Sequence, residues 1–160
     1  MSNPKDKPEI MMVATNHEAG RDYFILETVE AGIVLVGCEV KSLRGKQASL
    51  AGSFARLEGD EVFLYNMHIA PYAMGNRENP EPLRERKLLL HRSQIEKLRT
   101  KTTQKGMALV PLKVYFSDRG IVKVEIAVVK GKRFADRRED LKKKSIMREI
   151  DRAIKNRNRK

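Results

Sequence analysis

The sequence contains one cysteine and no tryptophan, and only 6% of its residues are aromatic. A single cysteine, Cys38, excludes an internal disulfide and any metal site built from several cysteines, and it is typical of a reducing compartment. Long apolar runs are also missing, since the longest, residues 31–38, includes two glycines and is far too short to span a bilayer. No apolar segment follows Met1. We therefore expect no signal peptide, no membrane partner and a cytoplasmic location.

Signatures of catalysis and of metal binding are scarce as well. His17, His68 and His91 are far apart in the sequence, and no cysteine or carboxylate stands near them at the spacing of metal ligands. Cys38 lies in an apolar context without a neighbouring histidine, which favours a small buried residue over a nucleophile. We expect no enzyme activity, no catalytic residues, no metal and no cofactor.

Positive charge is what the sequence has in excess, and it is concentrated at the C-terminal end. The chain of 160 residues has a formal net charge of +12, and residues 130–160 hold 14 Lys and Arg against 5 Asp and Glu. Isoleucines recur at positions 146, 150 and 154, which is helical spacing, while basic residues occupy most of the remaining circumference. Such a helix has little to bury on its own, so we expect it to be loose alone and to order against a polyanion, most simply a nucleic acid. A solvated basic tail without a specific role is the alternative.

The composition divides the chain into three parts. Residues 1–9 contain two prolines and mixed charges, which predicts a disordered leader. Residues 10–131 are enough for one self-sufficient core. Residues 132–160 form the basic tail, which we expect to be helical when it is bound to its partner.

Short strand patterns dominate the body. They predict strands at residues 10–15, 23–29, 33–36, 53–57, 61–65, 68–72, 88–90, 108–116 and 121–129. Residues 30–32 predict a turn, although one bent strand would fit equally well, and residues 58–60 and 118–120 predict hairpin turns. Residues 121–129 alternate apolar and polar side chains, so one face of that strand should be buried and the other solvated.

Helix signals are fewer. Residues 38–46 predict a short helix closed by Gly45, and a capping box of Ser93 and Glu96 predicts a second helix that ends by Gly106. Gly, Asn, Pro and Glu in residues 75–82 predict a surface loop. The whole pattern favours a mainly β protein with helices, a closed antiparallel oligonucleotide-binding-like β-barrel with flanking short helices and a C-terminal basic tail.

Basic and aromatic side chains of the body are also suited to nucleic acid. The basic residues cluster in two places, Lys41, Arg44 and Lys46 in one and Arg84, Arg86, Lys87 and Arg92 in the other. The rings available for stacking on bases are Tyr23, Phe24, Phe54, Tyr65 and Tyr72. Because aromatic residues are so few, we expect most aromatic rings of the body to be core, Phe24 and Phe63 above all. Tyr23 could equally be a core residue or an RNA contact.

Four segments, in order along the chain, resemble the small protein B family, the bacterial tmRNA-binding proteins of trans-translation. They are residues 32–44, 86–91, 109–116 and 129–140, and the resemblance extends from about Asn16 to the end of the chain. It implies an oligonucleotide-binding-like barrel that binds the tRNA-like domain of tmRNA. It also implies that the protein accompanies alanyl-tmRNA, with elongation factor Tu, to a ribosome stalled on an mRNA without a stop codon. The family is not one of enzymes.

The resemblance assigns RNA contacts to individual positions of the body. The family's tmRNA surface matches Tyr23, Glu30, Leu89, His91, Lys130, Gly131 and Lys132. Lys41 and Arg44 join this set on their charge. Glu30 cannot contact a phosphate because like charges repel, so it would accept a hydrogen bond from a base or a 2′-hydroxyl, or orient a basic side chain. The alternative is a turn residue beside Gly32.

The resemblance places the tail in the decoding centre of 16S rRNA and, as a helix, along the empty mRNA channel. About 24 helical residues would reach roughly 36 Å. The residues expected at the rRNA are Arg133, Arg137, Arg138, Lys142, Lys143, Lys144, Arg148, Arg152, Ile154 and Lys155. Ala135 stands where some members of the family carry a ring for stacking, and we hypothesise that Phe134 stacks instead. The competing hypothesis is a basic structural ribosomal protein or a ribosome assembly factor, which composition alone cannot separate from the first.

Overall fold

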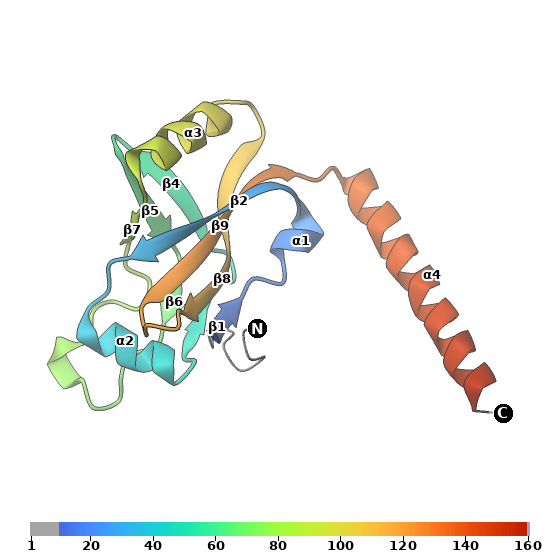
Figure 1. Cartoon of the computed structure of the whole chain (residues 1–160), viewed down its shortest axis with the longest axis horizontal. Coiled ribbons are helices and arrows are strands. Elements are labelled where there is room, and N and C mark those ends of the chain that lie inside the picture. The colour runs from blue at the N-terminus through green and yellow to red at the C-terminus, as the bar shows by residue number, and fades with distance from the viewer. Residues whose placement is uncertain (1–9, 160) are drawn as a thin grey trace, which may run out of the picture.

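The computed structural model of the chain describes residues 10–159, apart from the side chains of Asn76 and Phe134. The predicted leader, residues 1–9, therefore lies outside the described residues. Figure 1 shows a body of strands and short helices, from which one long helix projects.

Within residues 10–159 the body is mainly β, as the sequence predicted, and four α-helices accompany it. The strands are β1 (Met11–Thr15), β2 (Tyr23–Ile33), β3 (Ala48–Ser49), β4 (Phe54–Glu58), β5 (Glu61–Tyr65), β6 (His68–Ile69), β7 (Arg86–Leu89), β8 (Met107–Phe116) and β9 (Val122–Gly131). The helices are α1 (Ala19–Asp22), α2 (Gly37–Arg44), α3 (Arg92–Thr102) and α4 (Phe134–Asn158), and a 3₁₀ turn spans Asn76–Glu78. The strand predicted at residues 68–72 is thus reduced to β6.

Seven strands form one antiparallel sheet in the order β1-β8-β4-β5-β7-β2-β9, and β9 also pairs with β8. Nine residues of β9 pair with β2 and nine pair with β8, so β9 is held along its whole length on both sides. The pairing of β4 with β8 consists of Ala55 and Leu109, and that of β2 with β7 joins Gly32 to Leu89 and Ile33 to Leu88. The pairings therefore lead from β8 through β4, β5, β7, β2 and β9 back to β8, and the two pairings β4–β8 and β2–β7 are short.

The main core lies between these strands and is closed by two helices. Strand residues such as Val62, Leu64 and Ile126 have no exposed surface. Leu43 of α2 and Leu98 of α3 belong to the same cluster, and Figure 1 shows these two helices at opposite ends of the body. The body thus has a core of its own, to which α4 contributes no buried apolar side chain within the described residues.

A second, smaller apolar cluster lies on the outer face of β8 and β9. Ala127 and Val129 of β9 pack there with Ala19 of α1. The predicted alternation along this strand therefore holds only for its first half, where Lys123 and Glu125 are partly exposed. It fails in the second half because α1 covers the outer face.

Strand β2 corrects the turn that the sequence predicted at residues 30–32. It runs unbroken along β9, and its irregularity is a bulge between Ile25 and Glu27. Pairing with β9 provides partners for the backbone of Ala31 and Gly32, so the chain has no need to turn there. The bent-strand alternative was the closer one, and residues 34–36 lie beyond the end of the strand.

The predicted capping box of α3 is displaced by two residues. The helix begins at Arg92, with His91 as its N-cap residue, instead of beginning after Ser93. The side-chain oxygen of Gln94 accepts a hydrogen bond of 3.0 Å from the backbone N–H of His91. Gln94 thus does for the backbone N–H of His91 what Glu96 was predicted to do for that of Ser93. The predicted end of the helix before Gly106 is confirmed.

Several predictions of burial or backbone conformation are wrong. Phe24, predicted to be core, is 43% exposed. It lies in the part of β2, residues 24–28, in which every residue is exposed. Phe63 and Cys38 are half-buried instead of buried. Gly45 closes α2 as predicted, but its φ is −83°, and the following residue, Lys46, takes the left-handed conformation with a φ of 56°.

The C-terminal helix α4 has 25 residues and a length of about 37 Å. Its large apolar side chains, between 47% and 58% exposed, are Leu141, Ile146, Met147, Ile150 and Ile154. The helix that the isoleucine spacing predicted is present (Figure 1), and the side chains of its apolar stripe are exposed. Among the described residues, no helix combines the length and the apolar character that crossing a membrane requires.

Candidate nucleic-acid interface

Most of the RNA contacts predicted in the body lie on β2 or on the strands paired with its two ends. Tyr23, at the start of β2, pairs with Gly131, whereas Gly32, near its end, pairs with Leu89. Gly32 lies nine positions after Tyr23 along the strand, which corresponds to about 30 Å at 3.3 Å per residue. Glu30 lies between them, nearer the Leu89 end. A ligand that contacts both ends must therefore span about 30 Å, which a folded RNA can do.

At the Tyr23 end, the lysines that flank Gly131 differ in their surroundings. Lys130 and Gly131 are exposed. The side chain of Lys132 is only 8% exposed, since its ammonium pairs with Asp140 of α4 and donates a 3.1 Å hydrogen bond to the carbonyl oxygen of Gly20. The same ammonium lies 5.1 Å from the centre of the Phe24 ring. Lys130 is therefore presented to a ligand, whereas Lys132 is engaged between the body and α4.

Glu30 is held on the sheet surface by a buried tyrosine. The hydroxyl of Tyr115 donates a hydrogen bond to Oε2 of Glu30. Burial raises the pKa of Tyr115, and the hydrogen bond to Glu30 raises it further. Directly opposite Glu30 is Glu125, whose Oε2 lies 3.0 Å from the ammonium of Lys113. The interpretation of Glu30 as a turn residue is wrong, because β2 continues through it with its carboxylate fixed and exposed.

At the other end, Leu89 forms an exposed apolar surface over a glycine. Leu89 is 52% exposed, and a Cβ added to Gly32 would lie 3.2 Å from the Cβ of Leu89. Glycine thus lets β7 approach β2 closely where their pairing is short. Ile121, also 52% exposed, and Lys123 line the same crevice, which has a volume of about 380 Å³. An apolar surface beside a cation can pack against a base or sugar while the cation contacts a phosphate.

His91, Lys41 and Arg44 occupy further positions of the surface. His91 is the exposed N-cap residue that follows β7, two positions after Leu89. Lys41 and Arg44 lie on α2, where their cationic groups are each 5.3 Å from the centre of a ring, that of Tyr72 and that of Phe116 respectively. Both side chains remain available to phosphate because both residues are exposed.

The second basic cluster of the sequence is in large part structural. Arg86 has no exposed surface, and its guanidinium donates hydrogen bonds of 2.6 Å to Oε2 of Glu39 and to the carbonyl oxygen of Met67. Arg84 also pairs with Glu39. Burial raises the pKa of Glu39, but hydrogen bonds from Arg84, from the backbone N–H of Val36 and from Arg86 outweigh it and hold the pKa below its ordinary value. Arg86 therefore ties α2 to β7 and is unavailable to RNA.

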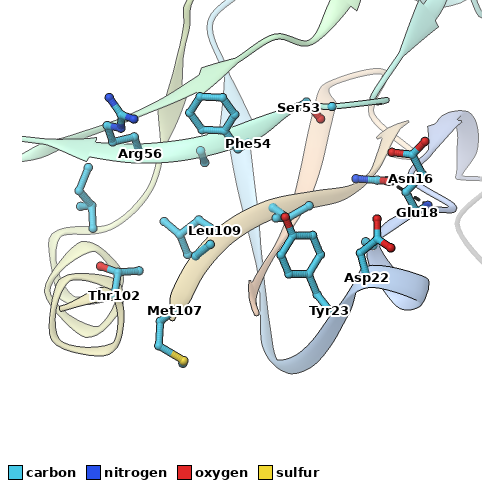
Figure 2. A pocket seen from close by; sticks show the side chains of 16 residues that line it. Asn16, Glu18, Asp22, Tyr23, Ser53, Phe54, Arg56, Thr102, Met107 and Leu109 are labelled. Carbon is cyan, nitrogen blue, oxygen red and sulfur yellow. Dashed lines mark hydrogen bonds between the residues drawn. The ribbon is translucent and has the colours of Figure 1, made fainter. Parts of the chain in front are cut away.

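A groove that the sequence did not predict opens beside Tyr23. It has a volume of about 640 Å³ and lies between α1, β4 and β8, where the β4–β8 join is narrow. Figure 2 shows Tyr23 on one side of the groove and Phe54 and Arg56 of β4 on the other. The Phe54 ring stacks on that of Tyr65 at 5.3 Å, and the Arg56 guanidinium lies 5.7 Å from the Phe54 ring centre. The available signal was the spacing of Phe54 and Arg56, which places both side chains on one strand face.

All ten residues predicted for the tail are exposed on or beside α4. They are Arg133, Arg137, Arg138, Lys142, Lys143, Lys144, Arg148, Arg152, Ile154 and Lys155. Ala135 is exposed and has no ring to stack. The side chain of Phe134 lies outside the described residues, so its stacking remains a hypothesis.

Within residues 10–159, no group of three or more His, Cys, Asp and Glu side chains is placed to hold a metal ion. A small β body with exposed basic, aromatic and apolar contact points, extended by a cationic helix, has the architecture of an RNA-binding protein. A family model described as SmpB protein matches residues 13–156. The chain therefore belongs to the SmpB protein family.

Known relatives match along nearly the whole chain. An SsrA-binding protein from Moorella thermoacetica is 52% identical over 93% of this chain and 96% of its own length. The SsrA-binding protein from Pelotomaculum thermopropionicum is 55% identical, with 94% of this chain and 97% of the relative covered. A solved chain from "tmRNA-SmpB: a journey to the center of the bacterial ribosome" has a TM-score of 0.65 and 51% sequence identity, and the match covers 75% of this chain and 84% of that one.

Proposed function

We propose that the protein binds the tRNA-like domain of tmRNA and delivers it to stalled ribosomes in the cytoplasm for trans-translation, that is, for ribosome rescue and peptide tagging. The observation that carries the proposal is the 51% identity and shared fold with a protein solved in a tmRNA–SmpB study of the ribosome. The SsrA-binding relatives, which match over more than nine tenths of the chain, support it. The function is binding and positioning, and it involves no catalytic step.

The body recognises tmRNA in this proposal. The circular pairing of β8, β4, β5, β7, β2 and β9 supports an oligonucleotide-binding-like barrel. Its contact points follow β2, with Tyr23, Lys130 and Gly131 at one end and Leu89 and His91 at the other. Glu30, fixed by Tyr115, accepts a hydrogen bond from a base or a 2′-hydroxyl, while Lys41 and Arg44 contact phosphates.

The tail senses the ribosome. It enters the decoding centre of 16S rRNA and follows the empty mRNA channel as a helix of about 37 Å. Its arginines and lysines contact rRNA phosphates, and its exposed isoleucines form the apolar anchor. Elongation factor Tu takes part indirectly, through alanyl-tmRNA.

Stoichiometry separates this proposal from a structural ribosomal protein or an assembly factor. The test is to fractionate ribosomes from cells and to quantify the protein per 70S particle, with and without expression of an mRNA that lacks a stop codon. We expect far less than one copy per ribosome, with a several-fold increase on ribosomes stalled by that mRNA and with tmRNA in the same fractions. One copy on every particle under both conditions would assign the protein to the ribosome itself.

A further inference from the structure

A basic crevice lies where α4 leaves the body. It has a volume of about 310 Å³ and is lined by residues of α1 and of the first turns of α4, with Lys132 of the connecting segment. The cations that line it are Arg21, Lys132, Arg137, Lys143 and Lys144. One of them, Arg21, belongs to the body, and the other four belong to the tail, so the crevice is a junction between the two parts.

The carboxylates at this junction neutralise only part of its charge. Asp22 lies 3.2 Å from Nε of Arg21 and 3.4 Å from a guanidinium nitrogen of Arg137, so two cations share it. Asp140 pairs with Lys132. Glu18 also acts on Arg21 through its charge, so five cations stand against three carboxylates, which leaves a formal excess of two positive charges. Like charges at this density repel, and an anion that enters the crevice would relieve the repulsion.

Lys132, which precedes α4, and two lysines of α4 hold the pKa of Asp140 below its ordinary value. Its pKa is lowered, first by the hydrogen bond from Lys132 and then by the charges of Lys132, Lys143 and Lys144. Asp140 is thus already used within the protein and cannot also balance the remaining cations. Arg137, Asp140 and Lys144 follow one another at intervals of three and four residues, which places them on one face of α4.

The size of the crevice suits a phosphate group. At about 30 Å³ for each water molecule, its volume equals that of about ten waters. That space accommodates a tetrahedral phosphate together with part of its hydration shell. The cations come from both sides of the junction, so one phosphate can contact Arg21 of the body and the lysines of the tail at the same time.

We propose that this crevice binds a phosphate group of an RNA backbone and thereby fixes the direction of α4 relative to the body. The RNA partner rests on the proposed function, whereas the anion site rests on the geometry alone. A bound phosphate adds contacts between α1 and α4 to the existing pairs of Asp22 with Arg137 and of Lys132 with Asp140. RNA binding at the junction then sets where the tail points before the tail meets its own site.

The direction of α4 can be measured on the full chain with two spin labels. Cysteines replace Gln104, exposed on the body, and Arg157, near the end of α4, in a chain in which Cys38 is changed to serine. Electron–electron distance measurements then follow the width of the distance distribution as inorganic pyrophosphate is added at constant ionic strength. We expect the distribution to narrow with a saturable dependence on pyrophosphate.

Matched variants show whether the crevice is responsible. Arg21→Gln removes the cation of the body, and Lys143→Gln with Lys144→Gln removes two of the tail. Either change should raise the half-saturating pyrophosphate concentration about tenfold, since each removes charge-assisted contacts to the anion. Arg119→Gln, which removes the same charge from the exposed turn between β8 and β9, should leave that concentration unchanged. Equal effects of Arg21→Gln and Arg119→Gln, or no narrowing in the parent chain, would overturn the proposal.

RNA replaces pyrophosphate in the last step. If the distance distribution narrows with the tRNA-like domain of tmRNA, tmRNA is the source of the phosphate. If it narrows only with small ribosomal subunits, rRNA is the source. If both fail while pyrophosphate still acts, the crevice is an anion site without an RNA ligand and the RNA proposal is wrong. A chain that responds to pyrophosphate but does not bind tmRNA at all would contradict the proposed function and leave the anion site standing.

Discussion

At the scale of single residues, the most consequential side chain is Glu39, which is 2% exposed and is bound by two arginines. A buried ion pair need not stabilise a protein more than apolar residues would, because both charges lose their water. Removing one partner is different, since it leaves the other charge buried without compensation. Arg86, with no exposed surface, would be that charge.

Glu39→Gln should therefore destabilise the body strongly. We expect a loss of about 3–5 kcal/mol in the free energy of unfolding, because Arg86 loses its countercharge while the side-chain volume stays nearly the same. Urea unfolding at pH 7 measures it. The control is Glu61→Gln, which breaks the exposed pair of Glu61 with Lys87 at 2.7 Å and should cost less than about 1 kcal/mol. Equal losses in the free energy of unfolding for the two variants would contradict the prediction that the buried ion pair contributes more than the exposed one.

The ionisation of Glu39 also makes the free energy of unfolding depend on pH, in a direction that its lowered pKa defines. The pKa of Glu39 in the folded protein lies below its ordinary value of 4.5, so the ion pair contributes stability that is present above pH 4.5 and is lost as the pH falls below it. Unfolding curves between pH 6 and pH 3 should show a steeper loss of stability for the parent chain than for Glu39→Gln. Parallel losses would show that other carboxylates cause the acid sensitivity.

Glu30→Ala should weaken binding to the tRNA-like domain of tmRNA without unfolding the body. The reason is that the exposed carboxylate, fixed by Tyr115, is lost from the contact surface while the core remains intact. Fluorescence anisotropy measures the affinity, and we expect a loss of about tenfold, as for one charged hydrogen bond of about 1.5 kcal/mol. Tyr115→Phe is the companion variant, because it frees the carboxylate without removing it, and its effect on affinity should be smaller. A collapse of thermal stability in Glu30→Ala would make Glu30 a structural residue.

At the scale of elements, α4 is a helix whose apolar side chains have no partner in the body among the described residues. Ile154 is 52% exposed. Substitutions on such a surface change the stability of a protein by less than about 0.5 kcal/mol. Any strong functional effect of a change at Ile154 must therefore arise from a contact with another molecule.

Ile154→Asn should leave the melting temperature of the protein unchanged and should reduce peptide tagging on stalled ribosomes. In the proposed function, the isoleucine anchors the tail only after the tail has entered the ribosome. A reconstituted tagging assay and a thermal melt measure the two effects on the same preparation. Arg119→Gln, in the exposed turn between β8 and β9 of the body, serves as a control for general loss of activity. If Ile154→Asn lowers the melting temperature by several degrees, α4 packs against the body and the independence of the tail is wrong.

Elements with local signals were the ones that could be predicted from the sequence. The hairpin at residues 58–60 is confirmed, because Gly59 takes a φ of 61° and Glu58 pairs with Glu61. The burial of Arg86 could not be predicted, since its partner Glu39 is 47 positions away in the sequence. The groove beside Tyr23 depends on how narrowly β4 joins β8, which is a property of strand packing and not of either strand alone.

The candidate site shows the same division. The charge and exposure of the tail residues followed directly from composition. The engagement of Lys132 with Asp140, Gly20 and the Phe24 ring did not, because it depends on where α4 starts relative to α1. A basic residue in a sequence is a candidate for phosphate contact, and only its neighbours decide whether its charge is still available.

At the scale of the whole molecule, the protein consists of a body with its own core and a helix of 25 residues that projects from it. The two parts meet at α1, where Asp22 pairs with Arg137 and the ammonium of Lys132 donates a hydrogen bond to the carbonyl oxygen of Gly20. This construction fits a protein in which the body recognises tmRNA and the tail reports on the state of the ribosome. It requires that the body function in RNA binding without the helix.

The most direct test is a truncation after Arg133, which removes α4 but keeps Lys130, Gly131 and Lys132. Binding to the tRNA-like domain of tmRNA and peptide tagging on stalled ribosomes are measured for the truncated and the full chain in the same buffer, at several salt concentrations. The account predicts nearly unchanged RNA affinity together with a loss of tagging. Loss of RNA affinity in parallel with tagging would contradict it, because the tail would then act as an electrostatic contact to tmRNA and not as a separate sensor of the ribosome.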